Sequence, residues 1–367
     1  MKILFVLPVI SDSYYQKRIE KLSELGVECS VMGFERDLYE GKPWNIPAKS
    51  IGHIEHGKYF KRIGTMLKSI STIRQTVKNK DVIYAYNLDV LLISWLATLF
   101  QSQNIKLVYD VVDIHPILTK KGFFPVILRS LERFLLKRTS VVVVTSPAYI
   151  EGYFKPIQKT DNTFVVIENK IDKDLVPDPA KSIPPISKKD HITIGYFGIL
   201  RCEKSLHVLK EIAENSTGEI RLYLRGFFLS SEDFEGIFNS LEFANYGGSF
   251  IYPDDLDEMF KPVDLAWGAH YQTEENKNWA IVHRFYQACY FKRPLIVQAG
   301  SQNAKLVNRY NIGLEIDLEN PKQTIQTIQN INFAQIDEWQ KNMREMPEDV
   351  YTFTDEYERF INVLKSS

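Results

Sequence analysis

The sequence predicts an α/β protein with two doubly wound domains, each a parallel sheet covered by helices on both faces. Two observations carry this prediction. Short β-rich runs alternate with helical patterns along the chain, and this alternation stops at one Pro-rich segment before it starts again. At 367 residues, the chain is long enough for two compact domains, each with its own core.

The first half contains five runs that are rich in Val, Ile and aromatic residues. Helical patterns lie between most of them, for example at Tyr15–Leu25 and Leu88–Phe100. Nearly continuous apolar runs are typical of strands that are buried on both faces of a parallel sheet. The predicted strands are KILFVLP (2–8), VECSVMGF (27–34), DVIYAYN (81–87), KLVYDVVD (106–113) and SVVVVTS (140–146).

The segment PDPAKSIPPISKKD contains four prolines and no periodicity, so it predicts a linker at 177–190. The domains are then an N-terminal one (1–176) and a C-terminal one (191–350), and 351–367 is expected to form a helix that packs back on the first domain. The second half repeats the alternation with ITIGYFG (192–198), a helix at 206–215, IRLYLRG (220–226), GSFIY (248–252), a helix at 253–261, DLAWGA (264–269), a helix from 282 and PLIVQ (294–298).

Composition excludes several classes of protein. The net charge of −1 gives no support to a nucleic-acid partner. Cys29, Cys202 and Cys289 are far apart and lack metal-ligand spacing, which favours a reducing, cytoplasmic compartment over a disulfide framework or a zinc site. The start MKILFVLPVI is a first strand rather than a signal peptide. The longest apolar run, VLLISWLATLF, is about half the length of a membrane span.

Ligands of open parallel sheets bind beyond the carboxyl ends of the strands. In GYFGILRCEKSLHVL, Gly198 is predicted to end a strand, and Arg201 and Lys204 enter the next helix. A glycine allows close approach of a ligand, and the helix start offers free N–H groups, so these residues suit a diphosphate. The alternative is a solvated Arg and Lys after an ordinary turn. The chain has no Walker motif and no GxGxxG fingerprint.

The order of these landmarks resembles glycosyltransferase family 4 and related retaining transferases of the GT-B fold, over nearly the whole chain. DVIYAYNLDVLLISWLAT resembles "DviyarnpdallaallaA", KLVYDVVDIHP resembles "lvyDvHDlyP", and ITIGYFGILRCEKSLHVL resembles "igyvGrl...KgldlL". HRFYQACYFKRPLIV resembles "pnKfyEylacGkPvi". The resemblance implies an α/β GT-B fold with two doubly wound Rossmann-like domains facing across a cleft.

The resemblance also implies roles for site residues. The nucleotide-sugar donor would lie in the second domain, with its diphosphate at Arg201, Lys204 and Gly198, and with Arg284 at the Lys or Arg position of "pnKfyE". The glutamate that holds the donor ribose is replaced by Gln287, and the earlier acid of Glu-x7-Glu is replaced by Trp279. An amide offers one acceptor oxygen where a carboxylate offers two. We therefore expect Gln287 to bind the donor ribose more weakly than a glutamate would, by about 1 to 2 kcal/mol.

A second departure lies in VYDVVDIHP, where Val112 takes the place of the family histidine that faces the donor sugar. Asp113 and His115 follow at the same strand end and are the candidate catalytic residues. A carboxylate that ends a buried apolar strand needs a polar task or a partner. The alternative for His115, which precedes a proline, is a structural role in the loop.

The family implies transfer of a sugar with retention, onto a glycan or a polyprenyl-linked saccharide, in the synthesis of bacterial surface polysaccharides such as capsule or lipopolysaccharide. No cofactor is implied, because the nucleotide sugar is a substrate, and UDP, GDP and dTDP stay open as its nucleotide. No metal is expected, since cations already meet the diphosphate and no Asp-x-Asp pair has a metal-binding setting.

Two stretches of the first half combine apolar residues at helical spacing with many cations. GKYFKRIGTMLKSISTIRQTVKNK carries seven Lys or Arg and no acid, and KKGFFPVILRSLERFLLKRTS is similar. Such helices suit an anionic membrane surface, which predicts a peripheral location on the inner membrane face. The alternative is that the apolar stripes pack on the sheet and the cations are solvated.

Three other functions are compatible with such a chain. A catalytically silent GT-B subunit that supports a partner transferase would explain Gln287 and Val112. A non-hydrolysing sugar-nucleotide epimerase shares the architecture but needs acids and histidines near the diphosphate, for which only His270 and His283 are candidates. A nicotinamide dehydrogenase is disfavoured by the missing glycine fingerprint.

Overall fold

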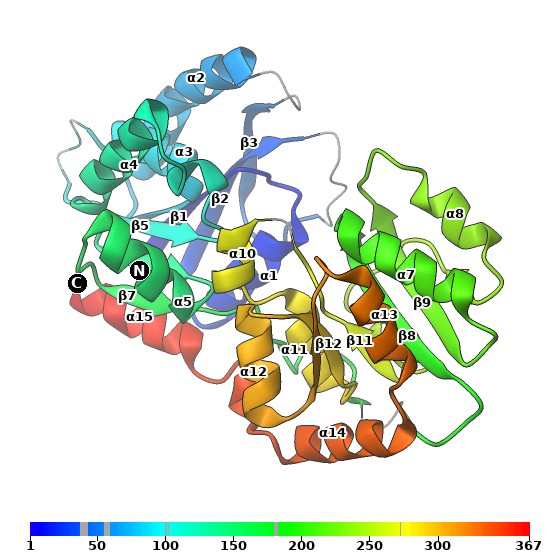
Figure 1. The fold of residues 1–367 in the computed structure, drawn as a ribbon. Helices are drawn as coiled ribbons and strands as arrows, with labels where there is room; N and C mark the ends of the chain where they lie inside the picture. The colour runs from blue at the N-terminus through cyan, green and yellow to red at the C-terminus, as the bar shows by residue number, and fades with distance from the viewer. Residues whose placement is uncertain (37–42, 55–58, 100, 102, 180–182, 272) are drawn as a thin grey trace. The chain divides into compact units, whose positions relative to one another are not determined.

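The computed structural model divides the chain into two compact units (Figure 1). The first unit comprises Met1–Glu168 and Asp355–Ser367, and the second comprises Asn169–Thr354. The structure describes residues 1–36, 43–54, 59–99, 101, 103–179, 183–271 and 273–367. Both units are parallel sheets with helices on their faces, which confirms the predicted α/β class with two doubly wound sheets.

The first unit contains a seven-stranded sheet in the order β3-β2-β1-β4-β5-β6-β7. Every neighbouring pair of its strands is parallel. The central strands are buried on both faces, as their continuous apolar runs require. The strands are β1 (Lys2–Leu7), β2 (Glu28–Glu35), β3 (Ala48–His53), β4 (Val82–Tyr86), β5 (Lys106–Val111), β6 (Val141–Val144) and β7 (Phe164–Val166).

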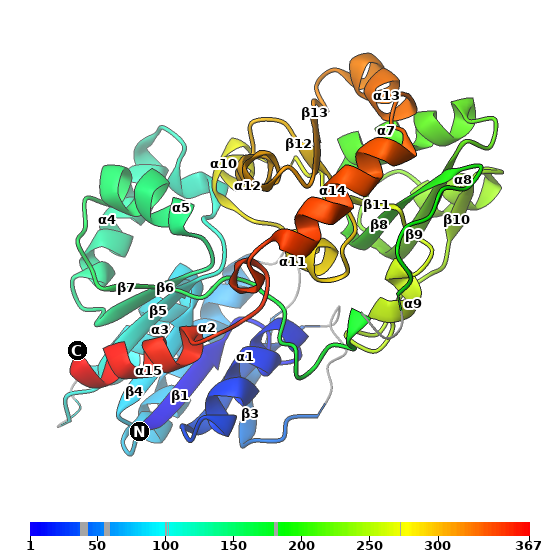
Figure 2. The same ribbon diagram turned by 90° about the horizontal axis from the view of Figure 1, so that it is seen from below.

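Helices cover both faces of this sheet, with α2, α3 and α4 on one face and α1 and α15 on the other (Figures 1 and 2). Trp95 of α3 packs edge-on against Phe134 of α4, with ring centres 5.1 Å apart. The helical segments are α1 (Ser13–Glu24), α2 (Tyr59–Val77), α3 (Asn87–Thr98), η1 (Pro116–Leu118), α4 (Phe123–Leu136), α5 (Pro147–Tyr149), the π-helical η2 (Ile150–Gln158) and α15 (Glu356–Ser366).

The C-terminal helix α15 packs on the first sheet. Phe360 lies against Tyr84 of β4, with ring centres 5.7 Å apart. The ammonium of Lys106, at the start of β5, donates to the carbonyl oxygen of Leu364 at 2.8 Å. These contacts make the last residues of the chain part of the first unit.

A buried ion pair joins α1 to the middle of the first sheet. Arg18 of α1 lies 3.1 Å from the carboxylate of Asp110 on β5, which is fully buried. Tyr84 donates to the same carboxylate at 2.6 Å, and Arg18 also donates to the carbonyl oxygen of Ile167 at 2.6 Å. Burial raises the pKa of Asp110, whereas Arg18 and Tyr84 act in the opposite direction. A buried charge with these partners fixes α1 on its face of the sheet.

A second buried carboxyl joins α4 to the opposite face. Glu132 of α4 is fully buried and accepts a hydrogen bond from Tyr109 of β5 at 2.8 Å. The hydroxyl of Tyr153 and the amide of Gln158, both in η2, also donate to it. Burial raises the pKa of Glu132 above its ordinary value of 4.5, although the three hydrogen bonds oppose the rise.

The second unit contains a six-stranded sheet in the order β10-β9-β8-β11-β12-β13, again parallel throughout. Its strands are β8 (Ile192–Leu200), β9 (Ile220–Phe228), β10 (Ala244–Tyr246), β11 (Leu265–Trp267), β12 (Leu295–Gln298) and β13 (Gly313–Ile316). Its helical segments are α7 (Glu203–Asn215), α8 (Phe234–Ser240), α9 (Leu256–Phe260), α10 (Glu274–Trp279), α11 (His283–Tyr290), α12 (Gln302–Tyr310), α13 (Pro321–Gln329), α14 (Phe333–Glu345) and η3 (Glu348–Val350).

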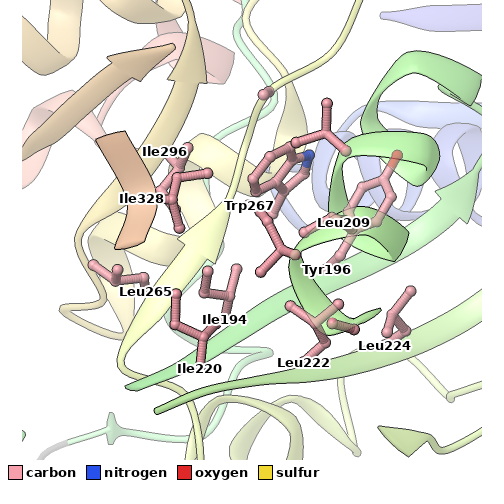
Figure 3. Packing of buried hydrophobic residues seen from close by; sticks show 14 of the residues in the cluster. Ile194, Tyr196, Leu209, Ile220, Leu222, Leu224, Leu265, Trp267, Ile296 and Ile328 are labelled. Carbon is pink, nitrogen blue, oxygen red and sulfur yellow. The ribbon is translucent and has the colours of Figure 1, made fainter. Parts of the chain in front are cut away.

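Two cores cover the faces of this second sheet. Alternate strand residues such as Ile194 and Tyr196 point to one face, where α7 contributes Leu209 (Figure 3). Their neighbour Phe197 points to the other face and packs with Phe285 of α11. The period of two along β8 therefore assigns each helix to one side of the sheet.

The start of the second unit includes residues 169–176, which the sequence analysis placed in the first domain. Ile171 pairs with Thr352 as an isolated parallel bridge, and its N–H donates to the carbonyl oxygen of Tyr351 at 2.9 Å. Part of the predicted linker packs on the same unit, because buried Arg293 donates to the carbonyl oxygen of Pro184 at 3.1 Å. Residues 180–182 of that linker lie outside the described residues.

Two glycines meet where β8 and β9 end. Gly198 and Gly226 are paired in register, and a Cβ on Gly226 would lie 1.8 Å from the carbonyl oxygen of Gly198. Gly226 also has a φ of +130°, which disfavours any residue with a side chain. The two strands stay paired up to Leu200 and Phe228, and glycine at 226 leaves room for the carbonyl oxygen of Gly198 within this pairing.

In the described part of the chain, no helix is both long enough and apolar enough to span a bilayer.

We expect Gly226→Ala to lower the free energy of unfolding by roughly 2 to 4 kcal/mol, because the new Cβ collides with backbone and the φ is strained. Gly300→Ala is the matched control, since Gly300 also has a positive φ but has open space around it. Gly300→Ala should lower the free energy of unfolding by about 1 kcal/mol. Urea unfolding of both variants measures the difference, and equal losses would contradict the collision.

The buried Glu132 should make stability depend on pH in a defined direction. Its folded pKa is raised, so the folded state holds a proton that the unfolded state releases near pH 4.5. Relative to Glu132→Gln, the wild-type protein should lose stability as the pH rises from 4.5 through the folded pKa. Urea unfolding at a series of pH values tests this, because other titrating groups are shared. A stability difference that stays constant with pH, or that grows in favour of Glu132, would show that the carboxyl is not held neutral.

Candidate functional site

The carboxyl edge of the second sheet gathers five of the predicted site residues. All its strands are parallel, so the segments that follow them lie at one edge. Gly198 does not end β8 as predicted, because the strand continues to Leu200. The contact with Gly226 allows this extension, and α7 begins at Glu203 after a short turn. Gly198 thus contributes a close approach between strands, and the turn that follows carries Arg201.

The amino end of α7 has no side chain that caps it. Its N-cap residue is Cys202, which makes no side-chain cap bond. The buried Cys202 thiol is used elsewhere, since it accepts a hydrogen bond from the N–H of Tyr271 at 3.3 Å. The first turn of α7 therefore keeps N–H groups that can donate hydrogen bonds to an anion, at the positive end of the helix dipole.

The two predicted cations at this helix end have different surroundings. Arg201 is exposed, and within the described chain its side chain makes no hydrogen bond or ion pair. Lys204 forms an ion pair with Glu319, which follows β13, and its ammonium lies 4.0 Å from the centre of the Tyr271 ring. Both partners of the pair are partly exposed, so solvent weakens it.

An acidic group supports the Tyr271 ring. Tyr271 donates its hydroxyl hydrogen to Glu274 at 2.6 Å, which raises the pKa of Tyr271 to about 12. The same bond lowers the pKa of Glu274, and Lys277 lies 3.0 Å from that carboxylate. Lys204, Tyr271, Glu274 and Lys277 thus form one connected cluster beside the start of α7.

Arg284 and Gln287 lie on one face of α11, one turn apart. Arg284 donates to the carbonyl oxygen of Phe197 at 2.9 Å, and its guanidinium carbon lies 4.8 Å from the centre of the Tyr196 ring. These contacts place the arginine against the end of β8, where a Cβ on Gly198 would be 3.9 Å from its Nη1. The structure therefore brings Arg284 and Gly198 together.

Two polar groups at this edge are buried without a partner in the described chain. Gln287, a third residue of this edge, is only 4% exposed. The Nε of Arg284 and the indole nitrogen of Trp267, at the end of β11, are buried and unpartnered. Buried polar groups are nearly always satisfied in native proteins. A polar ligand at this edge would explain the unpartnered Nε of Arg284, whereas Trp267 is fully buried in the core.

Asp113 and His115 belong to the first unit and follow β5. Asp113 is exposed, and the hydroxyl of Tyr149 donates to its Oδ1 at 3.0 Å. Burial raises the pKa of Tyr149, so this hydroxyl is a proton donor. The Nδ1 of His115 accepts from the N–H of Ile117 at 3.2 Å and caps η1. This hydrogen bond is of the kind expected for the structural alternative for His115. The catalytic roles of Asp113 and His115 stay predictions.

A cavity of about 550 Å³ lies elsewhere in the second unit, at the amino ends of β8 and β9. His191, Ile192, Ile220, Asn332 and Phe333 are among its lining residues. It is therefore at the opposite edge of the sheet from Gly198. Among the described residues, no group of three or more His, Cys, Asp or Glu side chains is placed to hold a metal ion.

Two residues that contact Lys204 at this edge, Glu319 and Tyr271, were not predicted from the sequence. Glu319 is an acid that follows the last strand of the sheet, so its position in the sequence could have placed it at the carboxyl edge. Its pairing with Lys204 depends on how β8 and β13 are arranged in the sheet, and that order is not visible in the sequence. Tyr271 had no signal beyond its place after β11.

No model of a known protein family matches the sequence. The two parallel sheets and their helices nevertheless define a protein of the GT-B fold, which solved structures share over the full chain.

Sucrose-phosphate synthase from Thermosynechococcus elongatus matches with a TM-score of 0.74 and 16% identity, over 100% of this chain and 99% of its own. HepE from Anabaena, in complex with UDP and glucose, matches with a TM-score of 0.71 and 15% identity, over 100% of both chains. The succinoglycan biosynthesis protein ExoL from Rhizobium meliloti (strain 1021) is 29% identical over 330 residues, which are 86% of this chain and 81% of ExoL.

Proposed function

We propose that this protein is a nucleotide-sugar-dependent glycosyltransferase of bacterial polysaccharide synthesis. The observation that carries the proposal is the carboxyl edge of the second sheet. There the uncapped start of α7, the unpaired Arg201, the unpartnered Nε of Arg284 and the nearly buried Gln287 follow the strands of one sheet. An anionic, polar ligand suits the helix start and the two arginines. The similarity to ExoL, a protein of succinoglycan biosynthesis, supports polysaccharide synthesis as the process.

The donor is a nucleotide sugar, with its diphosphate at Arg201, Lys204 and the start of α7. The solved structure of HepE in complex with UDP and glucose supports this class of donor. Gln287 would contact the ribose of this donor, and Arg284 lies beside Gly198. UDP, GDP and dTDP stay open as the nucleotide, because no group described here selects a base.

The reaction is a transfer with retention and without a metal ion. The bond from the anomeric carbon to the diphosphate oxygen breaks, and the acceptor oxygen bonds to that carbon on the same face. The acceptor proton passes to the leaving diphosphate. Negative charge builds on the diphosphate as it leaves, and the guanidinium of Arg201, the ammonium of Lys204 and the helix dipole stabilise that charge.

The acceptor is a glycan or a polyprenyl-linked saccharide, bound at the carboxyl edge of the first sheet. Asp113 can accept a hydrogen bond from a sugar hydroxyl there, while its Oδ1 is held by Tyr149. The process is the synthesis of a surface polysaccharide of the capsule or lipopolysaccharide type, in the cytoplasm at the inner membrane face.

Calorimetry with UDP, GDP and dTDP tests the diphosphate site. At least one nucleotide should bind, and Arg201→Ala should weaken that binding on the order of tenfold, because a charge-assisted contact is lost. Arg221→Ala is the matched control, since Arg221 is exposed near the amino end of β9. The affinity of the Arg221→Ala variant for the nucleotide should equal that of the wild-type protein. Equal losses in the two variants would place the diphosphate elsewhere.

Transfer itself is followed with labelled nucleotide sugars and bacterial membranes as the source of acceptor. The expected result is label in lipid-linked or polymeric saccharide. Nucleotide binding without transfer would favour a silent subunit. Conversion of the nucleotide sugar in the absence of any acceptor would favour an epimerase.

Lys204 is paired with Glu319, so a diphosphate must compete with a carboxylate for that ammonium. We expect Glu319→Gln to strengthen nucleotide binding about two- to fivefold, as suits a partly exposed ion pair. Glu315→Gln removes the same charge from an exposed position on β13 and serves as the control. Calorimetry at low salt measures both variants. An unchanged affinity in Glu319→Gln would show that Lys204 does not contact the diphosphate.

A further inference from the structure

The ring of Tyr271 makes a cation–π contact with Lys204. The ammonium nitrogen of Lys204 lies 4.0 Å from the centre of the ring, within the range of such contacts. The same ammonium is paired with Glu319. An ammonium has three N–H donors, and a ring face attracts its charge without occupying all of them. The contact with Tyr271 can therefore persist when the carboxylate of Glu319 is exchanged for another anion.

Two hydrogen bonds hold the segment that carries Tyr271 against the first turn of α7. The N–H of Tyr271 donates to the thiol of Cys202, the N-cap residue of α7, at 3.3 Å. The hydroxyl of Ser205, which is fully buried, donates to the carbonyl oxygen of Ala269 at 3.0 Å. The ring and Lys204 are thus carried by two segments that are bonded to each other. Their spacing does not depend on the lysine side chain alone.

The orientation of the ring is also fixed. The hydroxyl of Tyr271 donates to Glu274 at 2.6 Å, and the ring packs partly against the core of the second sheet. This hydrogen bond, together with Lys277 at 3.0 Å, lowers the pKa of Glu274, so the acceptor is a charged carboxylate at neutral pH. A phenol that donates to a charged acceptor is polarised toward a more electron-rich ring, which favours a cation at its face.

The ammonium of Lys204 needs such a support because of its surroundings. Lys204 and Glu319 are both partly exposed, so water competes for each charge. A lysine side chain loses much rotamer freedom when it is fixed. An ammonium that left Glu319 with no other contact would regain this freedom, and an incoming diphosphate would have to remove it again. The contact with the Tyr271 ring limits that loss.

We propose that Tyr271 is a positioning residue of the diphosphate site, and that its ring keeps the ammonium of Lys204 at the start of α7 when a diphosphate displaces Glu319. This inference rests on the proposed function, because it requires that Lys204 meets the diphosphate. Tyr271 acts through Lys204 and not on the ligand. Its contribution to binding therefore exists only while residue 204 carries a positive charge, which distinguishes positioning from packing.

Calorimetry with the nucleoside diphosphate that binds the wild-type protein tests the proposal. Tyr271→Leu should weaken this binding about three- to fivefold, because the cation–π contact is lost while an apolar side chain still covers the core. Tyr271→Phe keeps the ring face and should weaken binding less than about twofold. Tyr271→Met is a second variant without a ring, since its flexible side chain adapts to the core if leucine fits poorly.

A double-mutant cycle separates positioning from packing. Lys204→Met removes the ammonium, so Tyr271→Leu should weaken binding no further when it is added to Lys204→Met. A residue that only supports the fold of the site would weaken binding by the same factor in both backgrounds.

Tyr310→Leu is the matched control. It also removes a tyrosine ring beside a cation, because the guanidinium carbon of Arg309 lies 5.4 Å from the centre of the Tyr310 ring. Tyr310 ends α12, a helix that follows the carboxyl end of β12, so it lies away from the carboxyl edge. The Tyr310→Leu variant should bind the nucleotide like the wild-type protein.

The outcomes separate this inference from the proposed function. The role of Tyr271 is overturned if the Tyr271→Leu and Tyr271→Met variants bind like the wild-type protein, if Tyr271→Phe loses as much as Tyr271→Leu, or if the loss is equal in both backgrounds of the cycle. Nucleotide binding with the expected losses, but without sugar transfer, would support the role of Tyr271 and contradict the glycosyltransferase. A wild-type protein that binds no nucleoside diphosphate would overturn both.

Discussion

The close backbone contact between Gly198 and Gly226 allows β8 and β9 to stay paired to their ends, and it thereby sets where the turn into α7 begins. The carbonyl oxygen of Gly198 occupies the space in which a side chain of residue 226 would begin. With glycine there, β8 and β9 remain paired up to Leu200 and Phe228. The turn into α7 is then short, and Arg201 is carried by a strand end and a helix start. A short turn between two regular elements holds a cation more firmly than a long loop would.

The electrostatics of that edge follow from which groups have partners. The ammonium of Lys204 contacts the carboxylate of Glu319 and the ring of Tyr271. The side chain of Arg201, by contrast, is exposed to solvent. Arg284 donates one N–H to the carbonyl oxygen of Phe197, and its buried Nε has no hydrogen-bond partner in the described chain. A diphosphate at this edge would therefore meet the unpaired guanidinium of Arg201 and the ammonium of Lys204, which would be released from Glu319. The guanidinium of Arg284 would orient the diphosphate. The exchange of Glu319 for phosphate costs little, because both side chains of the pair are partly solvated.

The alternation of strands and helices predicted most strands of both sheets, because buried parallel strands leave a clear apolar signal. The predicted strand GSFIY (248–252) was wrong, since the strand of that region is β10 (Ala244–Tyr246). The edge strand β3 left none, since AKSIGH is polar and half-exposed. The end of β8 was misplaced because a glycine usually ends a strand, and here a second glycine far along the chain allows it to continue. Gly198 and Arg284, which the family resemblance assigned to one site, lie close together in the structure. Glu319 could not be, because its contact with Lys204 requires the strand order of the finished sheet.

In the first unit, two neighbouring residues of one strand fix both helical layers. Tyr109 and Asp110 point to opposite faces of β5, where Tyr109 binds Glu132 of α4 and Asp110 binds Arg18 of α1. Both carboxyls are fully buried, so each helix would leave a polar group without a partner if it rotated. This constraint explains why α4 holds phenylalanines in solvent. Burying them would remove Glu132 from its three donors, and that loss opposes the hydrophobic gain.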